Sequence, residues 1–207
     1  IVPTPLVSCE LLRRSASSAI IITASHNPAE DNGYKVYWSH GGQIVSPIDN
    51  LIIEEIETIT RIDEIPRMSL EQARRQGLLQ DLNDEADRFY FSQVEKLSWG
   101  RPEVNKDYGV VYTPLHGTGS RLVPELLKRR GFRRCRCVEE QMKADGNFPT
   151  LVSPNPEDPR AFEMALAEAE STDDLIIAND PDADRLGVMV RDAEHSWQRL
   201  DGNQIGV

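Results

Sequence analysis

Strand-like and helical segments alternate between residues 108 and 191, and this alternation constrains the fold more than any other feature of the sequence. Runs of apolar and β-branched residues predict short strands at 108–112, 174–178 and 186–191, and a further strand is expected at 133–139, where cysteines alternate with arginines. Amphipathic patterns between them predict helices at 120–130 and 159–170. Such alternation is typical of a sheet whose strands run largely parallel and whose faces are covered by helices. We therefore predict an α/β fold with mixed, largely parallel sheets and flanking helices.

The composition suits a globular chain and argues against some partners. With 207 residues, 39% of them hydrophobic, the chain can bury a core in one or two domains. The net charge of −11 argues against nucleic acid or an anionic membrane as a partner. No apolar run reaches membrane length, and no secretory signal is visible. The three cysteines form no C-x-x-C pair and favour a reducing cytoplasm. Cys135 and Cys137 alternate with arginines, which predicts that they share one strand face.

The first third of the chain predicts a hairpin, a helix and then a domain boundary. The runs 18–23 and 34–38 are typical of strands and flank an Asn-Gly turn. A helix is expected to start at Ser46-Pro47. Its predicted apolar face carries Ile48, Ile52, Ile56 and Ile59. Residues 61–83 are polar with weak periodicity and predict a boundary, after which a helix resumes at Asp84. Because both chain ends lie within apolar patterns, we expect a piece of a longer protein.

Acidic residues follow the third predicted strand at every second position. The segment 175–185 reads LIIANDPDADR, so Asp180, Asp182 and Asp184 come directly after an apolar run. An extended or curling loop can direct three such carboxylates to one point, where they repel one another unless a cation lies among them. Oxygen ligands favour a hard ion such as Mg²⁺, which also binds phosphate oxygens. Since ligands bind at the carboxyl ends of strands in open α/β sheets, this loop is a candidate metal site.

Other interpretations of this acidic loop differ in how well the residues fit them. An EF-hand loop starting at Asp180 would need Gly at its sixth position and Glu at its twelfth, where Arg185 and Arg191 stand, so that interpretation fails. A phosphatase with an aspartyl nucleophile also places D-x-D after an apolar strand. A solvated acidic turn needs no function at all. The residues alone leave both of these open.

A second unusual segment is ITASHNPAEDNGYK, at residues 22–35. It places Ser25 beside His26 at the end of a strand, ten residues before Lys35. Ser25 could be a nucleophile, an N-cap or an ordinary loop serine. A hydrolase nucleophile elbow is disfavoured because the segment lacks glycines two residues on either side of the serine. No Walker A pattern is present, although the turn Gly117–Ser120 could donate N–H groups to an anion or simply join a strand to a helix.

Taken together, the motifs resemble those of one enzyme family. TASHNP at 23–28, NGYK at 32–35 and DPDADR at 180–185 are similar to motifs of the α-D-phosphohexomutases, the phosphoglucomutase and phosphomannomutase superfamily. The supporting stretches are YTPLHGTG at 112–119, GNFPT at 146–150 and SPNPED at 153–158. The resemblance covers essentially the whole chain, and its two main motifs occur in family order.

The resemblance implies a role for each residue of the two motifs. Ser25 would carry a phosphoryl group, donating it to the sugar and recovering it. Lys35 would be a general acid/base near the reacting hydroxyl, Arg185 would brace the phosphoryl site and the base, and His26 would position the phosphoserine. The Mg²⁺ ligands would be Asp180, Asp182, Asp184 and a phosphate oxygen carried on Ser25.

The resemblance also implies a domain arrangement. Family members normally have four domains, so residues 1–80 would be the C-terminal part of domain 1, residues 81–201 domain 2, and residues 202–207 the start of domain 3. The sugar-recognition loop of domain 3 and the phosphate-gripping loop of domain 4 would be missing parts of the same chain. We therefore expect the 207-residue piece alone to be inactive as a mutase.

The expected reaction follows from the branch that the motifs resemble. Pro181 and Ala183 depart from the DGDGDR form of many members and indicate the phosphoglucomutase/phosphopentomutase branch. The implied reaction interconverts glucose 1-phosphate and glucose 6-phosphate through glucose 1,6-bisphosphate. Mannose and pentose phosphates are alternatives, and so is a non-catalytic module that binds sugar phosphate or metal. The expected partner is a phosphorylated hexose or pentose in the cytoplasm, with no nucleic acid and no membrane.

Overall fold

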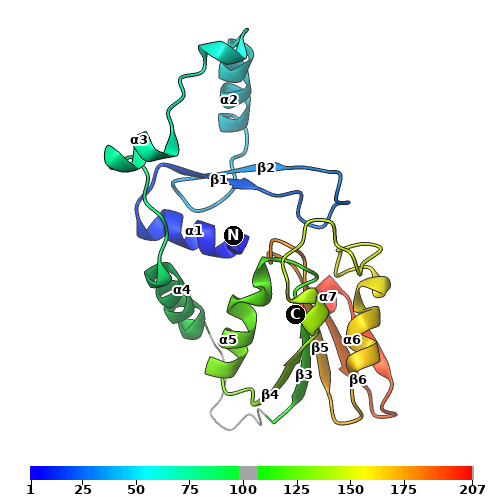
Figure 1. Ribbon diagram of the computed structural model, residues 1–207. Helices are drawn as coiled ribbons and strands as arrows, with labels where there is room; N and C mark the ends of the chain where they lie inside the picture. Colours follow the sequence, from blue (N-terminus) through cyan, green and yellow to red (C-terminus); the bar gives the residue numbers. More distant parts are fainter. Residues whose placement is uncertain (98–106, 207) are drawn as a thin grey trace.

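The computed structural model describes residues 1–97 and 107–206, arranged as a two-stranded hairpin and a five-stranded sheet with helices around them (Figure 1). The helices are α1 (Thr4–Arg13), α2 (Ile48–Glu57), α3 (Leu70–Arg75), α4 (Asp84–Lys96), α5 (Leu122–Arg129), α6 (Glu163–Glu168) and α7 (Gly202–Ile205). The strands are β1 (Ser18–Ile22), β2 (Tyr34–Trp38), β3 (Gly109–Thr113), β4 (Arg134–Cys137), β5 (Leu175–Asn179), β6 (Leu186–Arg191) and β7 (Trp197–Leu200). Within the described ranges no helix has the length and apolar character to span a membrane.

The large sheet has the strand order β4-β3-β5-β6-β7. β3 runs parallel to both β4 and β5, whereas β6 and β7 follow β5 as antiparallel neighbours. Every residue of β3 is buried, because a central parallel strand is covered on both faces. The predicted mixed, largely parallel α/β fold is confirmed, and β7 adds an antiparallel edge that the sequence pattern did not predict.

A hydrophobic core fills the sheet face that α6 covers. Val111 of β3 and Ile176 of β5 point to this face and pack with Phe162 and Ala165, all at most 1% exposed. Side chains alternate along a strand, so Tyr112 points to the other face, toward the turn before α5. Helices therefore cover both faces, and the carboxyl ends of β3 and β5 open toward the hairpin (Figure 1).

A smaller core joins the hairpin region to the large sheet unit. Leu6 of α1 is fully buried against Phe91 of α4 and Leu122 of α5. α1 also contacts β1, so one helix packs against both parts of the chain. In the hairpin itself, a Cβ at Gly33 would lie 2.0 Å from the Thr23 carbonyl oxygen, so only glycine permits this close approach. These contacts fix where the loop that carries Ser25 lies.

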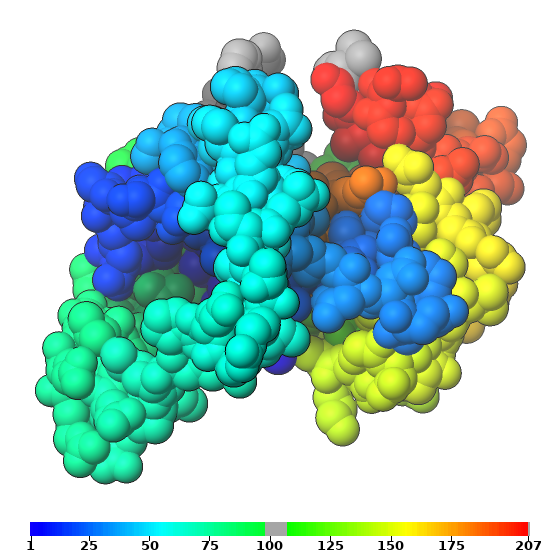
Figure 2. Space-filling view, turned by 90° about the horizontal axis from the view of Figure 1, so that it is seen from above, coloured from blue at the N-terminus to red at the C-terminus, as the bar shows by residue number. Residues whose placement is uncertain are grey.

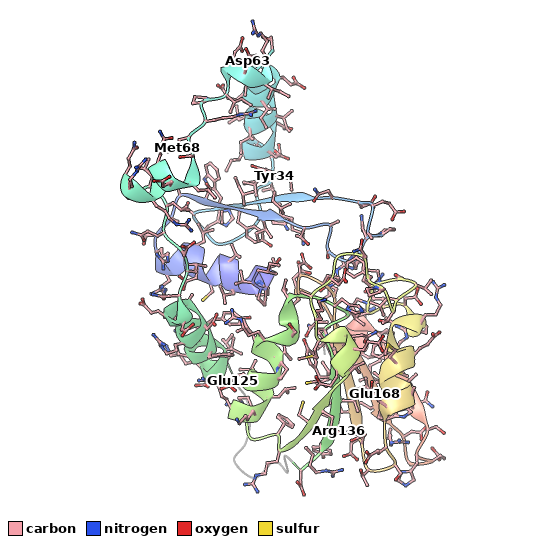
Figure 3. The ribbon with its side chains drawn as sticks, viewed as in Figure 1. Tyr34, Asp63, Met68, Glu125, Arg136 and Glu168 are labelled. Carbon is pink, nitrogen blue, oxygen red and sulfur yellow. The ribbon has the colours of Figure 1, made fainter. Side chains whose placement is uncertain are left out.

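The helix α2 forms near its predicted place but ends before Ile59, and its isoleucine face is only partly covered, since Ile48 and Ile52 are half-buried. No residue of α2 is buried, and Ile56 and Ile59 are exposed. The segment from α2 through α3 projects from the rest of the molecule, and Asp63 and Met68 mark its outer parts (Figure 3). An amphipathic pattern predicts the helix, but it does not by itself predict what packs on the apolar side.

Phe162 tests the contribution of the main core. We expect Phe162→Ala to lower the free energy of unfolding by about 3–5 kcal/mol, because it removes a fully buried ring and leaves a cavity. Leu97→Ala, at a side chain 73% exposed, should change stability by less than about 0.5 kcal/mol. Urea unfolding followed by circular dichroism measures both. Equal losses would contradict this assignment of the core.

Candidate functional site

The three aspartates converge in a tight turn at the end of β5. Asp180 and Asp182 are almost fully buried, whereas Asp184 is exposed. One carboxylate oxygen of each lies within 4.8 Å of the others. The turn closes with a 2.9 Å hydrogen bond from the Ala183 amide to the Asp180 carbonyl, and Ala183 takes the left-handed conformation, with φ of 55°. The predicted convergence is therefore present, through a tight turn rather than an extended segment.

Ser25 reaches this turn from the hairpin, 155 residues away along the chain. Its hydroxyl donates to Asp180 Oδ2 at 2.7 Å and lies 3.2 Å from Asp182 Oδ1. Its backbone is in the left-handed region, with φ of 54°, and its amide donates to Thr23 Oγ1 at 2.9 Å. This unusual backbone projects the hydroxyl out of the loop and toward the acids.

Lys35 places a positively charged side chain beside the three aspartates. It lies on β2 opposite Ile21 of β1, and its ammonium is 2.7 Å from Asp182 Oδ2 and 3.0 Å from Asp184 Oδ2. Partial burial alone would lower the pKa of Lys35, but the hydrogen bonds from the ammonium to these two carboxylates outweigh burial and raise the pKa. Lys35 is therefore firmly protonated in this arrangement.

His26 and Arg185 lie at the same site with weaker contacts. The Nδ1 atom of His26 is 3.3 Å from the Ser25 hydroxyl. Burial and the nearby charge of Arg185 lower the pKa of His26, which favours the neutral ring. The Arg185 amide donates to Asp180 Oδ1 at 3.0 Å. Across the described ranges, the Arg185 guanidinium makes no hydrogen bond or ion pair. The bracing role expected for its side chain thus stays a prediction.

The electrostatics of the cluster favour an added positive charge. Burial is the largest cause that raises the pKa of Asp180, and with the neighbouring carboxylates it brings the value to about 6, although the hydrogen bond from the Ser25 hydroxyl opposes this. Burial would also raise the pKa of Asp182, but the hydrogen bond from Lys35 holds it below the ordinary value. A hard divalent cation suits three converging carboxylates and would take the place of the proton on Asp180. The donor set therefore fits a metal ion such as Mg²⁺.

Residues outside the two motifs hold this loop in place. Thr4, at the start of α1, donates its amide to the Asp182 carbonyl at 2.9 Å and its hydroxyl to Asp182 Oδ2 at 3.2 Å. Asn179 donates to the Arg185 carbonyl at 2.6 Å and accepts a 3.3 Å hydrogen bond from Tyr112. Thr4 carries no local signal in the sequence. Asn179 stands directly before Asp180, and this position could have indicated that its side chain supports the acidic loop.

The loops around the site are also close-packed. Figure 2 shows the blue atoms of the hairpin against the yellow atoms of the long loop between β4 and α6. The negative charge of Glu157, in that loop, partly opposes the lowering of the His26 pKa. Gly117 also packs closely: an added Cβ would lie 2.4 Å from Pro181 Cα. The predicted glycine turn therefore lies against the acidic loop.

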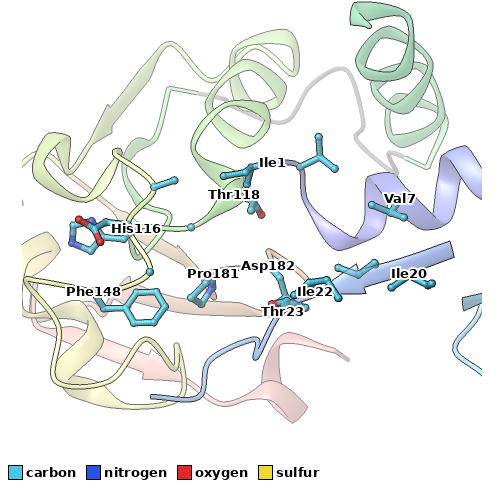
Figure 4. Close-up of a pocket in the computed structure, with 16 residues that line it drawn as sticks. Ile1, Val7, Ile20, Ile22, Thr23, His116, Thr118, Phe148, Pro181 and Asp182 are labelled. Atoms are coloured by element: carbon cyan, nitrogen blue, oxygen red, sulfur yellow. The ribbon is translucent and has the colours of Figure 1, made fainter. Parts of the chain in front are cut away.

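A cavity of about 420 Å³ lies beside the cluster (Figure 4). Its walls come from β1, the glycine turn and the loop that carries Phe148, and they are mainly apolar. Asp182 lines it, but Ser25 and Lys35 do not. The cavity therefore adjoins the polar cluster without containing its reactive groups.

The raised pKa of Asp180 predicts a pH-dependent stability. The folded state holds this proton more tightly than the unfolded state, so the contribution is full below about pH 4 and is lost as the pH rises through about 6. We expect the metal-free protein to lose up to about 3 kcal/mol relative to Asp180→Asn over this range. Urea unfolding of both proteins at several pH values measures the difference. Saturating Mg²⁺ should remove the loss, and a pH-independent difference without metal would contradict the prediction.

Gly117 tests the support of the acidic loop. We expect Gly117→Ala to cost about 1–3 kcal/mol and to weaken Mg²⁺ binding, because the new methyl group meets rigid backbone atoms of Pro181. Gly146→Ala is the matched control, since an added Cβ there meets nothing within 4 Å. Urea unfolding and titration calorimetry with Mg²⁺ measure the two effects. Unchanged metal affinity in Gly117→Ala would show that the contact does not support the loop.

Comparisons with known proteins match two family domains on this chain. The model for phosphoglucomutase/phosphomannomutase, alpha/beta/alpha domain I, matches residues 1–63, and the model for domain II matches residues 88–194. The interval between the matches includes the boundary predicted near residue 80, whose position stays a prediction. A crystal structure of a phosphoglucomutase/phosphomannomutase family protein from Burkholderia thailandensis has the same fold, with a TM-score of 0.62 and 24% identity over 92% of this chain and 39% of its own.

Curated relatives carry names for several sugar phosphates. A probable phosphomannomutase of Haemophilus influenzae is 38% identical over 99% of this chain and 41% of its own length. The phosphoribomutase of Saccharomyces cerevisiae is 38% identical over 99% and 35%, and the phosphoglucomutase of Staphylococcus aureus (strain MRSA252) is 40% identical over 98% and 36%. The chain thus spans less than half the length of these relatives. With both domain models matched in order, the chain belongs to the phosphoglucomutase/phosphomannomutase family of α-D-phosphohexomutases.

Proposed function

We propose that this chain contains the phosphoryl-carrying and metal-binding half of a sugar-phosphate mutase. The contact that carries the proposal is the 2.7 Å hydrogen bond between Ser25 and Asp180, two residues from separate domain matches. A hydroxyl held against a cluster of metal-ligand type can carry a phosphoryl group whose negative charge the metal balances. The EF-hand and hydrolase patterns do not explain such a pairing.

In the proposed site, Asp180, Asp182 and Asp184 hold Mg²⁺, and a phosphate oxygen on Ser25 completes the ligand set. The metal supplies charge neutralisation for phosphoryl transfer. The neutral ring of His26 lies beside the hydroxyl and orients the phosphoserine. The cationic Arg185 follows the last aspartate and braces the transferred group.

Lys35 is the proposed general acid/base. Its ammonium donates hydrogen bonds to Asp182 and Asp184, and these hydrogen bonds keep its pKa high. A divalent cation held by Asp180, Asp182 and Asp184 would neutralise these carboxylates, and the proposed role of Lys35 is to hold or release a proton at Nζ beside a sugar hydroxyl. Proton transfer at Nζ then becomes easier because fewer negative charges hold the proton.

The proposed substrate pair is glucose 1-phosphate and glucose 6-phosphate, with glucose 1,6-bisphosphate as intermediate and activator. The names of the relatives keep mannose and pentose phosphates as alternatives. Sugar recognition is assigned to domains of the full-length protein beyond this chain, so the 207-residue piece alone is expected to be inactive. A non-catalytic module that binds metal and sugar phosphate is the alternative from another class. A cytoplasmic role in carbohydrate metabolism fits the proposal.

Phosphorylation of Ser25 tests the proposal directly. We expect incubation with glucose 1,6-bisphosphate and Mg²⁺ to add one phosphate to the full-length protein, seen by intact mass spectrometry. Ser25→Ala should lose the adduct, and Ser39→Ala, at an exposed turn, should keep it. No adduct under any loading condition would favour the non-catalytic module.

Substrate choice is tested on the same full-length protein. We expect kcat/KM to be highest for glucose 1-phosphate among the 1-phosphates of glucose, mannose and ribose, in coupled assays. A higher value for ribose or mannose would reassign the substrate without changing the roles proposed for Ser25 and the aspartates. Lys35→Met should lower kcat when the assay starts from protein whose Ser25 is already phosphorylated. An unchanged kcat would remove Lys35 from proton transfer.

A further inference from the structure

Two cysteines outside the mutase site lie side by side on the edge strand β4. Arg136, between them, forms ion pairs with Glu170 and Asp173 and therefore points to the opposite sheet face. Because side chains alternate along a strand, Cys135 and Cys137 share the face toward α5. Their partners in β3 are Val110 and Tyr112. The sheet register thus holds both thiols in one row.

The two thiols interact with each other. A hydrogen bond from Cys137 lowers the pKa of Cys135 although burial opposes it, and the same hydrogen bond and burial raise the pKa of Cys137. The hydrogen bond thus makes Cys135 the more acidic thiol of the pair. Cys9, on α1, lacks this arrangement, and burial raises the pKa of its thiol.

The pair opens into a cavity of about 480 Å³ between β4 and α5. Glu125 and Lys128 of α5 and Arg133 before β4 provide its polar wall, and Figure 3 shows Glu125 and Arg136 on these neighbouring elements. Both thiols are partly exposed and reachable. Among the described residues, only the three aspartates form a group of three metal-ligand side chains. The cavity therefore offers two sulfur ligands without a third side-chain ligand for a tetrahedral zinc site.

We propose that Cys135 and Cys137 form a dithiol site that binds a trivalent arsenic species through both sulfurs. With R–As=O as the reactant, two As–S bonds form while the As=O bond and two S–H bonds break. The oxygen and the two protons leave as water. Arsenic stays trivalent, so the step needs neither an oxidant nor a reductant.

Strand geometry favours this bridge over a direct disulfide. A strand advances roughly 3.3 Å per residue, so residues two apart have Cα atoms about 6.6 Å apart. That spacing is at the upper end of the range of about 4.4–6.8 Å found for disulfides. An arsenic atom between the sulfurs lengthens the bridge and relieves this constraint.

The test uses phenylarsine oxide on the reduced protein, with the adduct measured by intact mass spectrometry. We expect one adduct that survives a glutathione concentration roughly 100-fold above the one that removes single-thiol adducts, because two sulfurs hold one atom. A dithiol such as dimercaptopropanol should remove it. Cys135→Ser and Cys137→Ser should each lose the resistance to glutathione, whereas Cys9→Ser should keep it.

Peptide mapping of the wild-type adduct gives a readout that needs no variant. The arsenic should lie on a peptide that contains both Cys135 and Cys137. Arsenic on Cys9, or resistance to glutathione that persists in either single variant, would overturn the proposal. So would an adduct that glutathione removes as easily from wild type as from the variants. Thermal unfolding of each serine variant verifies that the comparison is made on folded protein.

Discussion

Mutual repulsion among three carboxylates is the constraint on which the arrangement of this molecule depends. Asp180 and Asp182 are buried at the end of a central strand, where charge is poorly solvated. The structure compensates them with the Ser25 hydroxyl, the Lys35 ammonium and the Thr4 hydroxyl, all from the N-terminal part of the chain. The same carboxylates that form the candidate metal site thus hold the hairpin and α1 against the sheet unit.

Much of the sheet unit could be predicted because its signals are local. The strands near 109–113, 134–137, 175–179 and 186–191 were expected within a few residues, since β3 and β5 leave continuous apolar runs and β4 leaves an alternation of cysteine and arginine. The convergence of the aspartates followed from their position after such a run. Two spaced motifs then indicated the family, which the domain matches confirm.

The rest depended on tertiary contacts that leave no local pattern. Leu6 of α1 is buried by Phe91 and Leu122, so the contacts that stabilise this helix come from residues far away in the sequence. Thr4 donates a hydrogen bond to Asp182, which lies 178 residues further along the chain. The isoleucines of α2 predicted a helix but not its surroundings. The roles of Ser25, Lys35, Arg185 and His26 stay predictions, because geometry places the groups but does not show a reaction.

The long sequence separation of the site has a consequence for folding. Each half of the molecule can form its own local contacts, but the hydrogen bond between Ser25 and Asp180 closes a loop of 155 residues. Loop closure of this length carries an entropic cost that only docked surfaces can offset. During synthesis from the N-terminus, the hairpin leaves the ribosome long before its acidic partners exist. We therefore expect the site to form after the local contacts of the hairpin and of the sheet unit.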